Sequence, residues 1–455
     1  MDEPYDRSIL GTSKRLLESY AICNHCLGRQ FAWLSTHTSN EERGAAIKLT
    51  LSMMADEDLK SGNKQMGEEL IGILAGNGMF EPAKVLATQR ALEYKEQTSC
   101  HLCSVDGISI FDKLPDIAEK ARIAIDGIEF NSFLVGCVAS IGLDERQDEI
   151  RGAFGLLHGE ALKADVNREL GKILQDLLKR PVDFKSPDIV IVYKMDDDII
   201  EVNRNPIFIQ GRYRKLKRGV PQSRWDCGEC RGKGCEECGG TGRKYPDSIS
   251  EYIGEPTQQA AQGTKFKVHA AGREDIDVLM LGDGRPFVVE ISEPLVRAPN
   301  LQLLAKDINK KASGIVEVVD LKITTRKRAQ KIKDEASENV KEYSAIIQTE
   351  EDVTSKALQK AVKALSGIDI EQRTPNRVAH RRSDLVRRKH IYEVRLKRTK
   401  KKLLEGFFKV QGGTYVKELI SGDNGRTVPS LTEKLGTACE CTELNVTAIY
   451  EGNRP

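Results

Sequence analysis

Four Cys-x-x-Cys pairs constrain the fold of this chain more than any other feature of its sequence. Eight of its 11 cysteines fall into these pairs, which are Cys23/Cys26, Cys100/Cys103, Cys227/Cys230 and Cys235/Cys238. One such turn brings two thiolates within reach of a tetrahedral zinc ion, and a second turn completes the coordination. The N-terminus is acidic and has no hydrophobic signal core. We therefore expect a cytoplasmic protein whose cysteines bind metal rather than form disulfides.

The third and fourth pairs predict one compact zinc site, because they are adjacent in the chain and glycines surround them. Glycines let a backbone fold tightly around a small ion. The first two pairs lie far apart and enclose residues 42–90, whose Ala, Leu, Glu and Lys content predicts helices. A zinc ion there would hold together the two ends of a helical insertion. Redox chemistry at a single pair is the alternative. Because four pairs divide evenly into two closed sites, we favour one or two structural zinc ions and no organic cofactor.

Charge is unevenly distributed along the 455 residues, although 70 basic and 68 acidic side chains nearly cancel. Between Arg377 and Lys402 nearly every second residue is Arg or Lys, opposed only by Asp384 and Glu393. Such a stretch is either a solvated surface or the footprint of a protein that binds a phosphate backbone. The chain has no run of about 18 apolar residues, so we expect no membrane span.

The order of these patterns divides the chain into four segments. Residues 1–105 form the zinc-clamped helical segment, and residues 106–220 form an α/β segment whose last strand covers residues 207–210. Residues 221–248 form the compact four-cysteine module. Residues 249–455 alternate strand-like and helical runs, which predicts a mixed sheet with helices on one face. We therefore expect an α+β, multi-domain protein.

Three short motifs in the last segment carry groups suited to chemistry. The first, Gly272-Arg273-Glu274-Asp275, sets an acid beside an arginine between two strand-like runs, residues 266–270 and 287–291. Carboxylates at the mouth of a sheet are common in active sites. The other two motifs are Lys341-Glu342-Tyr343, just ahead of a strand, and Gly412-Gly413-Thr414-Tyr415-Val416-Lys417. Taken singly, each motif is typical of a turn or of the rim of a core.

In this order, the three motifs resemble those of pseudouridine synthases. The run that begins Arg180-Pro181-Val182-Asp183-Phe184 resembles the THUMP module, which in tRNA-modifying enzymes binds the acceptor end of tRNA. Residues 23–31, 373–382 and 421–427 resemble the archaeal-type tRNA pseudouridine synthases that act on uridines 54 and 55. This resemblance covers nearly the whole chain and implies an archaeal source.

The resemblance implies a role for each candidate site residue. Asp275, rather than the neighbouring Asp277, would act at the sugar of a flipped uridine. Lys417 would pair with this carboxylate, and Tyr343 would pack on the uracil. Further substrate contacts are expected from Val416, Leu444, Arg273 and Arg285. Independently of the resemblance, the dense basic stretch predicts contacts of Arg381, Arg382, Arg387 and Arg388 with the phosphates of the substrate.

The resemblance also implies the wider properties of the protein. Its catalytic domain would contain the mixed or antiparallel sheet of pseudouridine synthases, and its accessory region would bind zinc and contain the THUMP module. The partner would be tRNA rather than DNA, and the protein would be a monomer.

Two alternatives stay open at this point. One is another THUMP-type tRNA-modifying enzyme, a methyltransferase or a sulfur transferase. These enzymes need a glycine-rich or ATP-phosphate loop after a strand, whereas Gly282-Asp283-Gly284 is better interpreted as a turn. The other is a non-catalytic, zinc-dependent tRNA-binding protein. Such a protein would keep the cysteines and basic runs but would not need Asp275, Tyr343 and Lys417 together.

Overall fold

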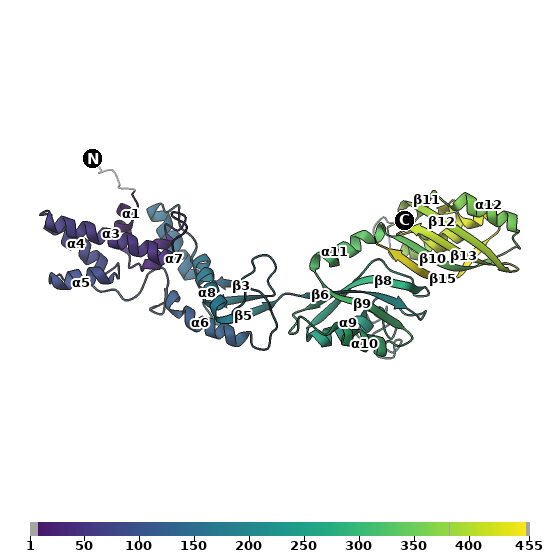
Figure 1. Ribbon diagram of the computed structural model, residues 1–455, viewed down its shortest axis with the longest axis horizontal. Coiled ribbons are helices and arrows are strands. Elements are labelled where there is room, and N and C mark those ends of the chain that lie inside the picture. The colour runs from purple at the N-terminus through teal and green to yellow at the C-terminus, as the bar shows by residue number, and fades with distance from the viewer. Residues whose placement is uncertain (1–7, 382, 452–455) are drawn as a thin grey trace. The chain divides into compact units, whose positions relative to one another are not determined.

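The computed structural model describes residues 8–451 apart from Arg382. The chain separates into two compact units, Met1–Asn205 and Pro206–Pro455, each with its own hydrophobic core (Figure 1). Among the described residues, no helix is both long and apolar enough to cross a membrane.

The first half of the N-terminal unit is helical, as predicted for residues 42–90. Its longest helix, α3 (Asn40–Lys60), begins with a capping box in which Ser39 and Glu42 satisfy each other's backbone N–H groups. The remaining elements are short helices and one small hairpin: α1 (Ile9–Ser19), α2 (Asn24–Arg29), α4 (Lys64–Ala75), α5 (Glu81–Gln89), β1 (Ser104–Val105) and β2 (Ile108–Ser109).

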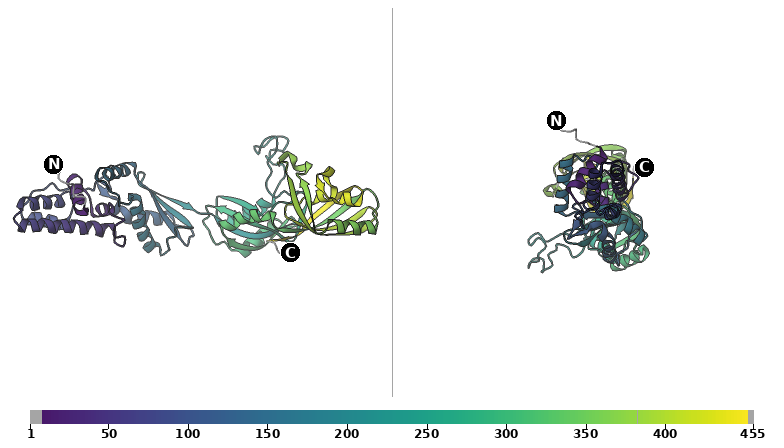
Figure 2. Two further views of the ribbon diagram at one scale, coloured as in Figure 1. Left: turned by 90° about the horizontal axis from the view of Figure 1, so that it is seen from above. Right: turned by 90° about the vertical axis from the view of Figure 1, so that its left-hand side faces the viewer.

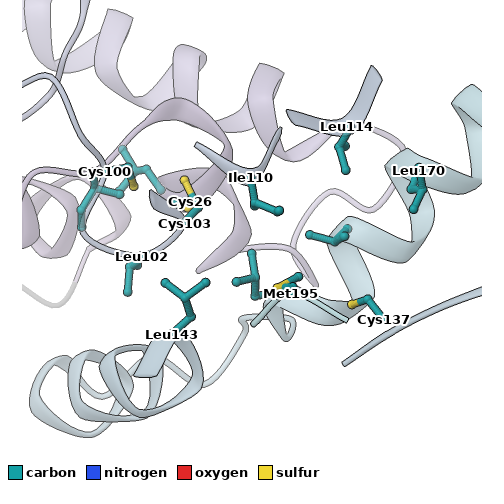
Figure 3. Close-up of a cluster of buried hydrophobic side chains, with 14 of the residues drawn as sticks. Cys26, Cys100, Leu102, Cys103, Ile110, Leu114, Cys137, Leu143, Leu170 and Met195 are labelled. Atoms are coloured by element: carbon teal, nitrogen blue, oxygen red, sulfur yellow. The ribbon is translucent and has the colours of Figure 1, made fainter. Parts of the chain in front are cut away.

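The second half of this unit is a three-stranded sheet with helices. The strands run in the order β3-β4-β5, with β3 parallel to β4 and β4 antiparallel to β5. The elements are α6 (Ile110–Ala124), β3 (Phe133–Val138), α7 (Ile141–Phe154), α8 (Leu162–Leu178), β4 (Ile189–Lys194) and β5 (Ile199–Arg204). One core runs from Leu16 to Met195 through both halves, so packing does not break at residue 105 (Figure 3).

The C-terminal unit is built on a ten-stranded sheet in the order β14-β11-β12-β13-β10-β15-β8-β6-β9, with β7 pairing to β8. The strands are β6 (Ile207–Lys215), β7 (Lys265–Ala270), β8 (Leu279–Ser292), β9 (Val316–Thr324), β10 (Val340–Thr349), β11 (Ile368–Arg373), β12 (Val386–Lys400), β13 (Leu403–Gln411), β14 (Thr427–Val428) and β15 (Cys439–Tyr450). The pairing of β15 with β8 is parallel, and the other pairings in this sheet are antiparallel. This parallel seam joins the two halves of the sheet.

Helices cover both faces of this sheet, so the prediction of helices on one face is wrong in part. The larger core packs Leu304 and Ile308 of α10 against Ile209 and Val289. Alternate strand residues point to the opposite face. There Phe208 and Val288 pack against α11. The helical elements are α9 (Ile249–Ala261), α10 (Leu301–Lys311), α11 (Arg326–Asp334), α12 (Ser355–Leu365), α13 (Val416–Ser421), α14 (Leu431–Leu435) and the 3₁₀ turns η1 (Glu335–Ser337), η2 (Asn376–Arg381) and η3 (Asp423–Gly425).

One predicted segment boundary is also wrong. Strand β6, which we assigned to residues 106–220, lies between β8 and β9 in the large sheet and buries Ile209 and Tyr213 in the second core. The units therefore meet between Asn205 and Pro206. The error arose because a strand's hydrophobic pattern does not say which sheet it joins.

Candidate functional site

The acidic loop, residues 271–278, connects β7 to β8 at the parallel seam of the large sheet. Its tight course requires Gly272, which has a φ of +87°. A Cβ at this position would lie 3.0 Å from the Lys341 ammonium nitrogen and 3.2 Å from Nη1 of Arg285. Glycine therefore serves both the backbone conformation and the close approach of two cations.

A buried ion pair supports the loop from inside. Arg285 and Glu274 are 1% and 7% exposed, and Nε of Arg285 lies 2.8 Å from the Glu274 carboxylate. The Tyr213 hydroxyl donates to the same carboxylate at 2.9 Å. Arg285 also donates to the carbonyl of Ala271 at 2.7 Å. The structure thus gives Arg285 a role in supporting the loop, because its guanidinium is enclosed and engaged there, and its predicted contact with substrate stays a prediction.

Lys215 of β6 holds the backbone of the loop from a second side. Its ammonium donates to the carbonyls of Asp275 at 3.2 Å and Ile276 at 2.7 Å. Burial lowers the pKa of Lys215 to about 8. These bonds to main-chain oxygens leave the side chain of Asp275 free to face outward.

Two cations converge on the Asp275 carboxylate. Nη1 of Arg377, from η2, lies 2.8 Å from it, and the Lys417 ammonium, from α13, lies 3.9 Å away. Lys417 makes its short contact, 2.6 Å, with Asp277 instead. Although burial opposes the shift, the hydrogen bond from Lys417 lowers the pKa of Asp277.

The main partner of Asp275 is thus Arg377, a residue to which the sequence analysis gave no role. Glu418, which is 5% exposed, orients the same guanidinium by accepting a hydrogen bond from its Nε at 2.6 Å. Arg377 lies inside the run 373–382 that carried part of the family resemblance. That resemblance was the one signal that could have pointed to it.

Tyr343 and two apolar side chains complete the surroundings of the acids. Tyr343 is half-buried on β10 opposite Val446 of β15. Desolvation, opposed by Arg285 and assisted by the charge of Asp275, raises its pKa to about 12. Val416 and Leu444 are 3% and 6% exposed in the core against which Tyr343 packs.

Lys341 is an unusual cation in this site. It is 6% exposed, and no acceptor for its ammonium is found in the part of the chain that the structure describes. Burial, with repulsion from Arg285, lowers its pKa to about 7. Lys341 and Tyr343 are two positions apart on β10, so both side chains project from the same face of the strand.

The remaining predicted contacts lie around the rim. Arg273 is exposed, and its guanidinium lies 5.4 Å from the centroid of the Trp225 ring. Arg387 donates to the Thr374 hydroxyl, and Arg388 pairs with Asp369 at 3.1 Å. Arg382 lies outside the described residues, and only the backbone of Arg381 is described, within η2.

The eight paired cysteines gather into the two predicted clusters, each with its sulfur atoms within 4.8 Å of one another. Around an ion with metal–sulfur bonds of about 2.3 Å, tetrahedral geometry separates the sulfurs by about 3.8 Å. The Cys23–Cys103 distance is 3.7 Å and the Cys227–Cys235 distance is 3.8 Å. Both clusters could therefore hold a metal ion.

The chain matches known families along most of its length. A family model described as "Pus10, C-terminal" matches residues 208–450, and one described as "Pus10 THUMP domain, archaeal" matches residues 117–194. The "tRNA pseudouridine synthase Pus10" of Methanothrix thermoacetophila is 39% identical over 439 residues, which cover 96% of this chain and 94% of the relative. The chain belongs to the Pus10 family.

Other Pus10 relatives give the same result. The Pus10 of Methanothermobacter marburgensis is 40% identical over 94% of this chain and 95% of its own length. That of Methanocaldococcus jannaschii is 38% identical over 99% of this chain and 96% of its own length. The predicted α+β, multi-domain architecture with a THUMP region is confirmed. The Pus10 C-terminal match includes both the acidic loop and the four-cysteine module.

Proposed function

We propose that this chain is a tRNA pseudouridine synthase that isomerises uridines 54 and 55 of the T-loop. The observation that carries the proposal is the convergence of Arg377 and Lys417 on Asp275 beside Tyr343, within the region matched by the Pus10 C-terminal model. Its Pus10 relatives are named tRNA pseudouridine synthase, which argues against a protein that only binds tRNA.

The reaction needs a flipped base and an ionised acid. A stacked uridine must first leave the T-loop and enter a pocket. Asp275 then acts at the sugar, as a nucleophile at C1′ or as a base at C2′, while the C–N bond breaks. The freed uracil turns and bonds to C1′ through C5. C5 then loses its proton while N1, released from the sugar, gains one, so the formula is unchanged. No oxidant, reductant or organic cofactor is consumed.

The neighbours of Asp275 suit these steps. Arg377 at 2.8 Å stabilises the ionised carboxylate in a partly enclosed site. With its pKa raised to about 12, Tyr343 stays a neutral phenol that can donate a hydrogen bond and offer its ring to uracil. Val416 and Leu444 keep water away from the broken glycosidic bond.

Both cysteine clusters suit structural zinc. Four thiolates fill the tetrahedral coordination of zinc and leave no open position for substrate, so the ions would stabilise structure rather than react. We further propose that the enzyme is a cytoplasmic monomer that binds tRNA through its THUMP region and the basic stretch around β12.

Tritium release from tRNA labelled at C5 of uridine tests the proposal, with tRNA affinity measured in parallel. Asp275→Ala should abolish release and leave affinity within about threefold, because a single carboxylate contributes little to binding a polyanion. Asp277→Asn is the matched control and should keep most of the activity. Transcripts with a single T-loop uridine then separate the two target positions. Normal product from Asp275→Ala would end the proposal.

A further inference from the structure

The four-cysteine module, residues 221–248, contacts the acidic loop at two points. The Gln222 side-chain amide donates to the carbonyl of Gly272 at 3.0 Å and to the Tyr213 hydroxyl at 2.8 Å. Farther into the module, the Trp225 ring lies 5.4 Å from the Arg273 guanidinium. Both contacts thus reach the loop within three residues of Asp275.

The two contacts are supported differently. Backbone bonds from Ile249 to Pro221 and from Ser250 to Gln222 fasten the base of the module to the start of α9. Gln222 is therefore held whatever happens inside the module. Trp225 lies beyond this base, and its position depends on the two arms of the module staying together.

Apart from metal binding, the arms are joined by a short backbone ladder that includes a bridge of Asp226 with Arg243, and by contacts of the Trp225 ring, over which the Lys244 ammonium lies 5.6 Å from the centroid. Backbone bonds join Lys244 to Trp225 and Cys227 to Gly242, and Tyr245 meets the Trp225 ring edge-on at 5.6 Å. Among the described apolar side chains of the module, Pro221 at its base and Cys227 are buried. In Figure 2 the module stands out from the ribbon of its unit as a loop without helices or strands. A segment with so little apolar burial depends on its metal to hold one conformation.

We infer that a metal ion in the four-cysteine module braces the acidic loop through the contact of Trp225 with Arg273. The bound metal keeps the two arms of the module together, and the arms fix the position of Trp225. The indole ring of Trp225 in turn fixes Arg273, which lies two residues before Asp275. Trp225 is then a positioning residue rather than a catalytic one. The inference rests on the proposed function, because its kinetic readout is pseudouridine formation.

Loss of the metal would change catalysis more than binding. A loop that samples several conformations presents Asp275 correctly for only part of the time. A displacement of about 1 Å can lower a rate about 100-fold. Because Gln222 and Lys215 still hold the loop, we expect a smaller decrease in kcat, about tenfold. Affinity for tRNA should stay within about twofold of the wild-type value, since phosphate contacts dominate it.

The experiment uses the full-length chain with Trp33→Phe, which leaves Trp225 as its single tryptophan. In this background Cys235→Ser/Cys238→Ser removes half of the ligands of the module and none of the other cluster. We expect one equivalent less of bound zinc, a red-shifted Trp225 emission and the decrease in kcat. Zinc removal from the parent protein by a chelator should reproduce the emission shift if the cysteine variant fails to fold.

Matched substitutions distinguish a specific contact between Trp225 and Arg273 from a general packing role of these side chains. Trp225→Phe and Arg273→Lys keep a ring and a cation and should retain most of kcat, whereas Trp225→Ala and Arg273→Ala should lose about tenfold. Trp225→Ala combined with the double cysteine variant should be no worse than either alone, because all remove one interaction. Gln222→Ala should lower kcat equally with and without metal in the module.

Several outcomes would overturn the inference. Unchanged emission and full kcat after metal loss would show that Trp225 does not depend on the metal. Weaker tRNA binding at constant kcat would make the module an RNA-contacting surface instead. If the parent chain forms no pseudouridine, the proposed function fails, while zinc content and emission still test the contact between module and loop.

Discussion

The two cysteine clusters share ligands and sulfur spacing but differ in their surroundings. In the N-terminal unit, Cys26, Cys100 and Cys103 are buried, and helices α3–α5 separate the two pairs along the chain. In the C-terminal unit only Cys227 of the four is buried, and all the ligands lie within 12 consecutive residues, 227–238. The first cluster is part of a core, whereas the second is a surface loop.

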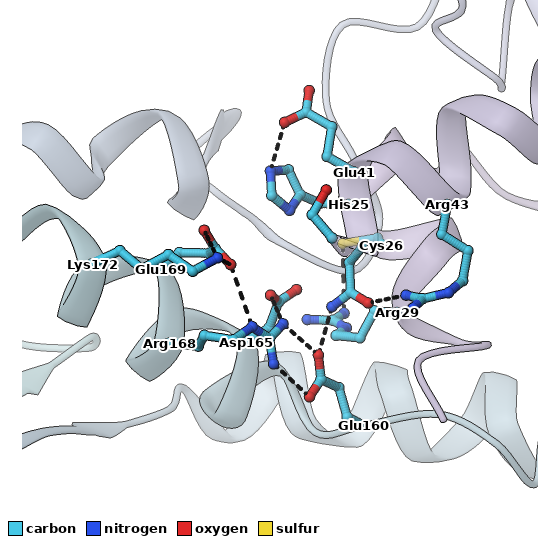
Figure 4. A network of polar contacts seen from close by, with 12 residues as sticks. His25, Cys26, Arg29, Glu41, Arg43, Glu160, Asp165, Arg168, Glu169 and Lys172 are labelled. Carbon is cyan, nitrogen blue, oxygen red and sulfur yellow. Dashed lines mark hydrogen bonds and ion pairs between the residues drawn. The ribbon is translucent and has the colours of Figure 1, made fainter. Parts of the chain in front are cut away.

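Buried polar groups around the first cluster reinforce this contrast. Arg29 is fully buried with Nη2 3.5 Å from the sulfur of Cys26, and its Nε and Nη1 lack hydrogen-bond partners among the described residues. Four thiolates around one divalent ion carry an excess negative charge, which a buried cation can offset. Nearby, Arg168 joins Asp165 and Glu160 at 2.6 Å each (Figure 4). Metal in this cluster would therefore stabilise a whole unit, and metal in the module would adjust one loop.

The largest effect is expected from Cys100→Ser/Cys103→Ser. Structural zinc contributes about 10–16 kcal/mol of apparent binding free energy, comparable to the whole stability of a domain, about 5–15 kcal/mol. The N-terminal unit should lose its protection from hydrogen exchange and proteolysis, and tRNA affinity should decrease. If the variant kept its protection from hydrogen exchange and proteolysis, the first cluster would not stabilise its unit more than the second one does.

A smaller loss of stability is expected from Lys48→Met. The buried Lys48 ammonium donates to the carbonyls of Ile22 at 2.8 Å and Gly78 at 2.6 Å and to the Asn24 side chain at 2.9 Å. Removing this ammonium leaves the acceptors of Ile22 and Asn24, on either side of Cys23, without this hydrogen bond. We expect this to lower the free energy of unfolding by about 1–3 kcal/mol. Urea unfolding should show this loss, with weaker zinc binding in the first cluster only. Lys60→Met on the exposed end of α3 is the control.

Lys341, one of the buried lysines of the C-terminal unit, should behave in the opposite way to Lys48. Because Lys341 lacks a hydrogen-bond acceptor among the described residues, Lys341→Met should stabilise this unit by about 1–2 kcal/mol at pH 6.

The pH dependence of this gain follows from the lowered pKa of Lys341. That pKa is about 7 in the folded chain, against about 10.4 when unfolded. Between these values the unfolded chain binds the extra proton, so wild-type stability rises with pH. The advantage of Met should be largest below pH 7 and decrease as the pH rises from 7 towards 10. Melting curves across this range check it, and a less stable variant at pH 6 would contradict it.

The smallest effect on stability is expected from Cys235→Ser/Cys238→Ser. The module buries little apolar surface, so its loss should change the unfolding free energy of the C-terminal unit by less than about 1 kcal/mol. Calorimetry measures this directly. For the same reason a chelator should remove its zinc faster than that of the buried cluster. Equal rates of zinc loss from the two clusters would contradict the expectation that burial protects the first cluster.

Local patterns allowed much of the fold to be predicted. The helices of residues 42–90, the strand-like runs 266–270 and 287–291 and the pairing of the cysteines follow from periodicity and spacing. Strands β11 and β12 were not predicted, and the sequence of β12 indicated only a basic stretch. The motif around Asp275 could be located because a short loop between two strands keeps its residues together. These features depend on neighbours in the chain.

Other parts of the site could not be predicted, because they depend on contacts between distant residues. Asp275 pairs with Arg377 more closely than with Lys417, and Arg285 turns inward to Glu274. Nothing in the local sequence distinguishes one arginine from another in these roles. Likewise β6 joins the large sheet because its apolar residues fit that core.

By itself, the sequence determined the four cysteine pairs of the two clusters, since residue type and spacing are enough to specify them, whereas the choice of Asp275 over Asp277 came from the family resemblance. Only the tertiary structure decided which cluster is buried, which cation reaches Asp275 and which side chain of the module reaches the acidic loop. Ion pairs and burial depend on distances through space, and strand pairing between remote segments sets those distances.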